Sequence, residues 1–327
     1  MKNSKSIGVR DIAQKCNLNI STVSRALNRS PKVAKDTMEY VLRTANQMGY
    51  HLSNIQKQSH IIIILPDSAI QMAWYSLNMI NALTLRLREK GYSWEFINAD
   101  QVHVIQERSV GGIISFDFCG NQAKQLSQNY QLPVICINDQ PNHTNNVYSV
   151  ISDDKDAIKL ALDCLYSYGH KKIAFINFSN ESEHAFKRQD LFNHFAREKE
   201  SYPEYQHVFV NGSPIKNHGL VLDLSKSGIT AIICGGESSG LLMVNSLNAC
   251  NIRIPKDMSL ITWELPFVSA LLHPALTTVG QDFAMLAEKA VQLLEEQQNS
   301  QKDIQDIIVP YKLFLRESVS LPSNLLG

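Results

Sequence analysis

From Ile61 onward the chain alternates short apolar runs with stretches of helical periodicity, and this alternation limits its fold more than any other feature. The apolar runs are continuous, which is typical of strands in parallel sheets that helices cover on both faces. Strands are expected at 61–66, 93–98, 110–116, 132–138, 171–177, 207–211, 231–234 and 258–264, with helices near 74–90, 121–129, 154–168 and 184–199. The sequence therefore predicts an α/β body of doubly wound parallel sheets, with ligands bound at the carboxyl ends of the strands.

Length and composition narrow the class further. A chain of 327 residues is too long for one ordinary core and suits two or three domains. It has no run of 18 uncharged apolar residues and no apolar signal core at the N-terminus, so we expect a cytoplasmic protein with no membrane partner. None of the six cysteines belongs to a C-x-x-C pair. We therefore expect buried free thiols, with no metal site and no cofactor.

The charged residues divide the chain into a basic head and an acidic body. Residues 1–60 hold ten Lys and Arg against three Asp and Glu, a net charge of +7. Residues 61–327 hold 21 Lys and Arg against 28 Asp and Glu, a net charge of −7. This division favours contact between the head and a polyanion. Charge alone leaves open a three-helix packing domain whose polar face only meets solvent.

Helical periodicity predicts three short helices in the head, over residues 9–16, 20–28 and 34–48. At about 100° per residue, the second helix has an apolar arc made of Val23, Ala26 and Leu27. The opposite arc has no acid and consists of Ser21, Ser24, Arg25 and Asn28. Hydroxyl, amide and guanidinium groups suit phosphate oxygens and base edges. This helix-turn-helix is therefore expected to bind DNA.

The head also resembles a known family. The stretches "VRDIAQKCNLNISTVSRALN" at 9–28 and "VAKDTMEYVLRTANQMGY" at 33–50 are similar to the head of the lac repressor (LacI/GalR) family. The family's D-[VI]-A and T-V-S-R-x-L-N patterns begin here at Asp11 and Thr22. The resemblance implies base contacts from Ile20, Ser21 and Arg25, and phosphate contacts from Arg10, Thr22, Ser24 and Asn28. For Ile20, the helical wheel turns the side chain toward the core.

The segment after the head departs from the family pattern. "YHLSNIQKQSHIIIIL" lacks the Pro, the Ala-Arg pair and the late Leu of a hinge that becomes helical on operator DNA. Leu52 or Ile55 could replace the leucine that enters the minor groove, and a plain linker is the alternative. We therefore assign residues 1–50 to the head and residues 51–60 to a short hinge or linker.

Scattered motifs extend the resemblance across the body. They are "YGHKKIAFI" at 168–176, "HPALTTVGQDF" at 273–283 and "IIVPYKLFLRESV" at 307–319. The resemblance implies a two-lobed body over residues 61–327, similar to periplasmic binding proteins. The first lobe is expected at about 61–148 plus 280–305, and the second at about 149–279 plus 306–327.

The same resemblance implies an effector site in a cleft between the lobes. Arg188 stands nineteen residues beyond Gly169, at the spacing of the family's effector arginine, and "TWE" gives the family's aromatic and acidic positions. An arginine and a carboxylate across a cleft suit polyhydroxylated ligands. The implied effector residues are Asn138, Arg188, Glu237, Trp263, Glu264, Gln281 and Phe283. The alternatives are a surface position for Arg188 and helix N-caps for the two glutamates.

The resemblance implies a regulator that is a homodimer on a pseudo-palindromic operator. A small sugar or sugar derivative is expected to change its affinity for that DNA. The expected role is a repressor of sugar-utilisation genes, with galactosides among the candidate sugars.

One motif favours a hydrolase instead. Residues 236–240 have the pattern G-x-S-x-G between an apolar run and a helix expected from Leu241, where a nucleophile elbow would place Ser238. Such an enzyme needs an Asp and then a His downstream, and His273 is the one histidine that follows. An enzyme that uses Ser238, fused to a DNA-binding head, is the alternative interpretation.

Overall fold

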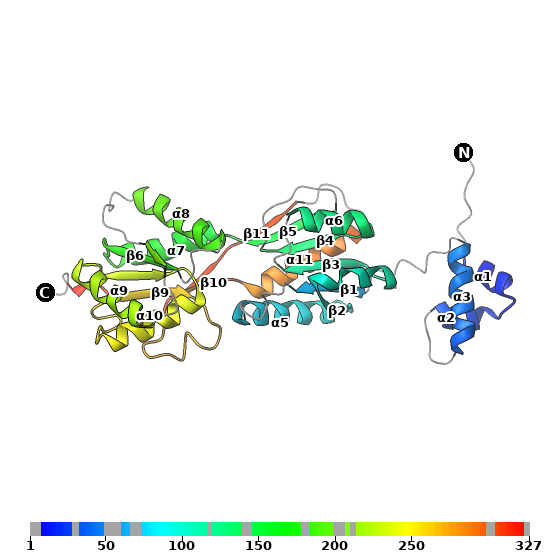
Figure 1. Ribbon diagram of the computed structural model, residues 1–327, viewed down its shortest axis with the longest axis horizontal. Coiled ribbons are helices and arrows are strands. Elements are labelled where there is room, and N and C mark those ends of the chain that lie inside the picture. The colour runs from blue at the N-terminus through cyan, green and yellow to red at the C-terminus, as the bar shows by residue number, and fades with distance from the viewer. Residues whose placement is uncertain are drawn as a thin grey trace.

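The computed structural model describes residues 8–27, 33–48, 60–65, 73–116, 120–138, 146–177, 183–198, 207–209, 214–298 and 305–323. In these parts of the chain a three-helix head precedes two α/β lobes (Figure 1). Asn28 and residues 51–59 of the expected hinge lie outside the described residues.

Three helices form the head: α1 (Val9–Cys16), α2 (Ile20–Leu27) and α3 (Lys35–Gln47). The α1 helix begins where the Asp11 carboxylate accepts a hydrogen bond from the backbone N–H of Gly8 at 2.7 Å. Such a bond satisfies a donor that the helix itself leaves unpaired. The apolar sides of the helices close around the fully buried Ile12, Val23 and Val41. The polar side of α2 is therefore turned outward.

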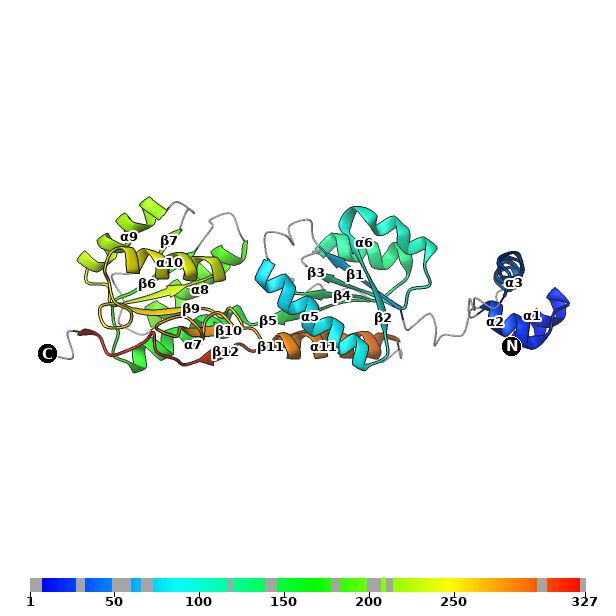
Figure 2. The same cartoon turned by 90° about the horizontal axis from the view of Figure 1, so that it is seen from below.

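The first lobe contains a six-stranded parallel sheet in the order β11-β5-β4-β3-β1-β2. Its strands are β1 (His60–Leu65), β2 (Ser93–Asn98), β3 (Gly112–Phe116), β4 (Val134–Ile137), β5 (Val147–Ser152) and β11 (Ile307–Val309). One face carries α5 (Ala73–Glu89) and α11 (Phe283–Gln298), and the other carries the 3-10 helix η2 (Ala99–Glu107) and α6 (Gly120–Tyr130) (Figure 2). Because neighbouring side chains of a strand face opposite ways, Ile61 packs toward α5 and Ile62 toward α6.

The second lobe contains a sheet in the order β12-β10-β9-β8-β6-β7, in which β12 is antiparallel to β10 and the other pairs are parallel. Its strands are β6 (Ile173–Asn177), β7 (His207–Phe209), β8 (Ala231–Cys234), β9 (Ser259–Trp263), β10 (Thr277–Gly280) and β12 (Lys312–Phe314). One face carries α7 (Asp154–Ser167) and α8 (Glu183–Glu198), and the other carries α9 (Pro214–Lys226) and α10 (Glu237–Ala249) (Figure 1).

The described chain crosses between the lobes three times, from β5 to α7, from β10 to α11 and from β11 to β12 (Figure 1). The β5 and β11 strands both belong to the first sheet, whereas the sequence had placed most of β5 and all of β11 in the second lobe. The crossings are bonded to one another. The backbone N–H of Asp153 donates to the carbonyl of Val309 at 3.0 Å, and Lys312 forms an ion pair with Asp282.

Candidate DNA-binding face and effector site

The α2 helix presents the side chains that were predicted to contact DNA. Ser21 and Arg25 are exposed, and Thr22 and Ser24 are half-buried. Ile20, which the helical wheel had turned toward the core, is instead 51% exposed. Side chains on a helix tilt toward its N-terminus. The side chain of Ile20, the first residue of α2, therefore extends beyond the turns that form the core.

A second exposed arginine, Arg10, lies on α1. The described α2 helix has no carboxylate, and Arg25 is its cation. A guanidinium matches the major-groove edge of guanine, and short hydroxyls match phosphate oxygens. The outward face of α2 therefore has the chemistry of a DNA-reading helix.

Arg188, the predicted effector arginine, is the centre of a hydrogen-bonded network in the second lobe. Its Nε donates to Oδ1 of Asp154 at 2.9 Å, and its Nη1 donates to the carbonyl of Gly235 at 2.7 Å. The guanidinium lies over the ring of Trp263, 4.7 Å from the ring centroid. Asp154 is 5% exposed and has Lys187 at 3.9 Å from its other oxygen. The structure thus brings Arg188 and Trp263 together with a buried carboxylate.

A buried tyrosine completes this network. The hydroxyl of Tyr311, at the crossing from β11 to β12, lies 3.3 Å from Oδ1 of Asp154 and 3.5 Å from Nη2 of Arg188. Burial raises the pKa of Tyr311, so the phenol stays protonated and donates to Asp154. Burial lowers the pKa of Arg188, but the electrostatic interactions and hydrogen bonds with Asp154 and Tyr311 together outweigh that effect and leave the pKa raised. Arg188 therefore stays charged, and Asp154 balances that charge.

Glu264, the predicted effector acid, forms an ion pair with Arg316 in the second lobe. Trp263 and Glu264 are adjacent at the end of β9, where successive side chains point to opposite faces of the sheet. The Glu264 carboxylate accepts two bonds from Arg316, at 2.9 and 3.0 Å, and a third from the hydroxyl of Thr278. Glu264 therefore belongs to an ion pair separate from the network around Arg188, and its contact with an effector stays a prediction.

The other described effector residues gather on the first lobe. Asn138 follows β4, and its side chain donates to the hydroxyl of Tyr75 at 2.6 Å and accepts from the backbone N–H of Ser152 at 2.8 Å. Gln281 donates to the hydroxyl of Ser152 at 2.8 Å. The rings of Phe283 and Tyr75 lie 5.9 Å apart. We call these five residues the neutral cluster, because none of them carries a formal charge at neutral pH.

The structure gives the G-x-S-x-G segment a packing role. The α10 helix begins at Glu237, earlier than predicted, so Ser238 lies in its first turn. A Cβ added to Gly240 would lie 2.8 Å from Cβ of Thr262, closer than side chains approach one another. Glycine at this position therefore lets α10 approach β9. The side chains of Glu237 and Ser238 lie outside the described residues.

Sequence reasoning missed Asp154 and Tyr311. Asp154 follows β5, and that strand was not predicted, so the position of the carboxylate at the end of a strand was hidden. Tyr311 lies within the motif at 307–319, for which no division into two strands was predicted. Pro310, which has no N–H to donate to a sheet, was the signal that this stretch divides into two strands.

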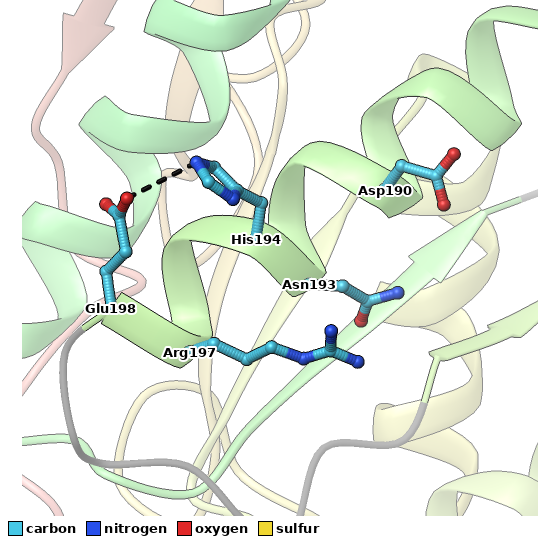
Figure 3. Close-up of a pocket in the computed structure, with 5 residues that line it drawn as sticks. All are labelled: Asp190, Asn193, His194, Arg197 and Glu198. Atoms are coloured by element: carbon cyan, nitrogen blue, oxygen red, sulfur yellow. Dashed lines mark ion pairs between the residues drawn. The ribbon is translucent and has the colours of Figure 1, made fainter.

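A cavity of about 400 Å³ lies along α8, away from Arg188. It is lined by side chains that follow one face of that helix, Asp190, Asn193, His194, Arg197 and Glu198 (Figure 3). His194 lies 3.3 Å from Glu198, one helical turn further along. Phe192, on the opposite face of α8, is fully buried in the lobe core. The cavity is therefore separate from the network around Arg188.

The described residues contain no helix long and apolar enough to cross a membrane. Within the same residues, no three His, Cys, Asp or Glu side chains are grouped as metal ligands. The cysteines that the structure describes are free thiols, four of them buried, and Cys119 lies outside the described residues.

Two family models match the chain. Residues 9–53 match the model of bacterial regulatory proteins of the lacI family, and residues 162–319 match that of the periplasmic binding protein-like domain. Catabolite control protein A of Priestia megaterium is 24% identical over 340 residues, which cover 95% of this chain and 99% of that protein.

Solved structures share the fold. The lac repressor dimer bound to operator and the anti-inducer ONPF has a TM-score of 0.69 at 19% identity, over 97% of this chain and 100% of that one. The complex of the transcriptional regulator CelR with cellobiose has a TM-score of 0.66 at 16% identity, over 95% and 99%. The relatives are transcription regulators, which are not enzymes, so the hydrolase interpretation is wrong. With a helix-turn-helix domain followed by a periplasmic-binding-protein-like domain, the chain belongs to the lacI family of bacterial regulatory proteins.

Proposed function

We propose that this DNA-binding regulator is a repressor of sugar-utilisation genes, and that a small sugar or sugar derivative changes its affinity for the operator. The observation that carries the proposal is the outward face of α2, where Ser21 and Arg25 are exposed beside Thr22 and Ser24. Ser21 and Arg25 supply base contacts, and the hydroxyls of Thr22 and Ser24 supply phosphate contacts. Arg10, Ile20 and Asn28 complete the proposed DNA-binding residues.

The proposed effector site consists of the network around Arg188 and the neutral cluster. Both stand beside the crossings between the lobes, because Tyr311 follows β11, and Ser152 and Gln281 flank two of the connections. A ligand held by both groups would favour one arrangement of the lobes. The CelR complex, which contains cellobiose, supports a sugar as the ligand class. By linkage, DNA must then weaken the binding of any effector that weakens the binding of DNA.

We further propose a homodimer. Four exposed apolar side chains support association: Trp74 and Leu77 on α5 are 44% and 62% exposed, and Phe267 and Leu271 are 86% and 83% exposed. Two heads related by a two-fold axis would place two α2 helices in major grooves about 34–36 Å apart. The operator is therefore expected to be a pseudo-palindrome.

Selection of operator DNA from a random pool by the purified full chain tests this function. We expect enrichment of a pseudo-palindromic sequence, with affinity that falls steeply as salt rises because phosphate contacts release counterions. A reporter gene placed behind the enriched sequence should be repressed by the wild-type protein and relieved by a sugar. Enrichment of no sequence over the starting pool would contradict the proposal.

A further inference from the structure

We propose that the effector site accepts an uncharged polyhydroxylated ligand and rejects an anionic one, and that Asp154 sets this preference by balancing the charge of Arg188. The inference rests on the proposed function of the site and narrows its ligand class. An arginine without a partner in the same place would favour a sugar phosphate or a carboxylate, since a guanidinium binds both in bidentate fashion.

The geometry around Asp154 carries the first step. Its Oδ1 lies 2.9 Å from Nε of Arg188 and 3.3 Å from the hydroxyl of Tyr311, and the side chain is 5% exposed. An anion that approached Arg188 would come close to this carboxylate in a partly dry site, where repulsion between like charges is strong. Lys187 reaches the other oxygen of Asp154 at 3.9 Å, but it is 48% exposed, so solvent screens its charge.

The hydrogen-bonding capacity of Arg188 carries the second step. A guanidinium has five N–H groups. Three of them point to Asp154, the Gly235 carbonyl and Tyr311, and the ring of Trp263 covers one face. Among the residues that the structure describes, no partner takes the other two N–H groups, which can serve a ligand. They can donate to the oxygens of neighbouring hydroxyls without requiring a countercharge.

The neutral cluster and Glu264, the other described groups proposed or predicted for the site, add no unbalanced charge to it. In the neutral cluster, Asn138, Gln281 and Ser152 offer amide and hydroxyl groups of the kind that pair with sugar hydroxyls. Arg316 and Thr278 occupy the carboxylate of Glu264, one of the two acids that were predicted for the site. The described part of the site is therefore balanced in charge and rich in neutral donors and acceptors.

Inorganic phosphate is a direct probe of this balance, and the assay needs neither DNA nor a known effector. The thermal midpoint of the full chain is measured against phosphate concentration, with chloride at equal ionic strength and pH as the reference. We expect no saturable shift for the wild-type protein. Asp154→Asn should show a saturable rise in midpoint, with a dissociation constant at least about tenfold below the highest phosphate concentration at which the wild type shows no such rise. The double variant Asp154→Asn/Arg188→Met should lose that rise.

Asp257→Asn is the matched control. Like Asp154→Asn it removes the charge of a carboxylate that is bonded to an arginine, here Arg253, but this pair lies at an exposed position. It should respond to phosphate as the wild type does. A saturable shift of the wild type that Arg188→Met abolishes would overturn the proposal, as would an Asp154→Asn protein that responds like the wild type. Asp154→Ser serves as a second neutral variant if Asp154→Asn does not fold. If neither variant folds, the proposal is tested by comparing the phosphate titrations of the wild type and Arg188→Met.

These outcomes are independent of the proposed function. Failure to select operator DNA would contradict the regulator and leave the phosphate titration unchanged. Binding of phosphate by the wild-type site would overturn the charge assignment and leave the DNA-binding role intact.

Discussion

Arg316 and Glu264 are joined by two hydrogen bonds, from Nη1 to Oε2 at 2.9 Å and from Nη2 to Oε1 at 3.0 Å. The two side chains are 18% and 12% exposed. Arg316→Met removes the cation and leaves the Glu264 carboxylate buried, and losing one partner of a buried pair costs about 3–5 kcal/mol. We expect the free energy of unfolding to fall by about 3 kcal/mol in urea titrations.

Arg253→Met is the control for this change. Arg253 and Asp257 also form an arginine–carboxylate pair with two bonds, but their side chains are 62% and 33% exposed. Exposed pairs contribute little to stability, so this variant should unfold close to the wild-type midpoint. Equal losses in the two variants would show that burial of the Glu264 pair is not what matters.

Replacing each of two helical glycines by alanine should change the free energy of unfolding in opposite directions. A Cβ on Gly240 would lie 2.8 Å from Cβ of the buried Thr262, whereas a Cβ on Gly219 would meet nothing within 4 Å. Gly240→Ala should destabilise the protein by about 1–3 kcal/mol through overpacking. Gly219→Ala in α9 should stabilise it by up to about 1 kcal/mol, because alanine favours the helix. Denaturant midpoints measure both, and a stabilised Gly240→Ala protein would refute the close approach of α10 to β9.

His170 should make stability depend on pH. Its Nδ1 lies 2.9 Å from the hydroxyl of Thr230, and its Nε2 lies 2.8 Å from the carbonyl of Ser320. Burial lowers the pKa of His170 below the ordinary 6.5. Below about pH 6.5 the unfolded chain therefore binds more protons at His170 than the folded chain does. The stability that the neutral, buried imidazole contributes is present above that pH and is lost as the pH falls toward the lowered pKa.

The measurement is the urea midpoint at pH 8.0 and at pH 5.5, for the wild type and for His170→Gln. The wild-type midpoint should fall more on acidification than that of the variant, which has no imidazole at this position. Equal falls in the two proteins would mean that His170 does not carry the effect.

Arg25→Ala should weaken binding to the selected operator by about 1–3 kcal/mol and relax the preference at one base pair, because Arg25 is the cation of the outward face of α2. Arg10→Ala should weaken binding about equally for all sequences and lower the salt slope by about one. Arg43→Ala, an exposed arginine on α3, is the control for general loss of positive charge. Sequence preference that survives in Arg25→Ala would place base reading elsewhere.

The sequence predicted the layered sheets because their central strands are continuous apolar runs. It missed β5, whose "VYSVIS" has serine and tyrosine between the apolar residues, and this hid Asp154. Spacing placed Arg188 near Trp263, and the structure brings the two together. Spacing could not assign Glu264, because a motif gives a position along a strand, whereas partners depend on the face to which the side chain points. Tertiary contacts alone showed that Arg316 takes that carboxylate.

The threefold crossing also governs how the protein can be made. Each sheet receives a strand from the last part of the chain, β11 in the first lobe and β12 in the second. A ribosome must therefore synthesise the chain to about residue 309 before the first sheet has all its strands, and to about residue 314 before the second does. The three head helices, in contrast, close their own core as soon as residues 8–48 emerge. A chain that stops before Ile307 would lack an edge strand in both lobes at once. A late nonsense codon should thus release a DNA-binding head attached to a body that cannot complete its fold.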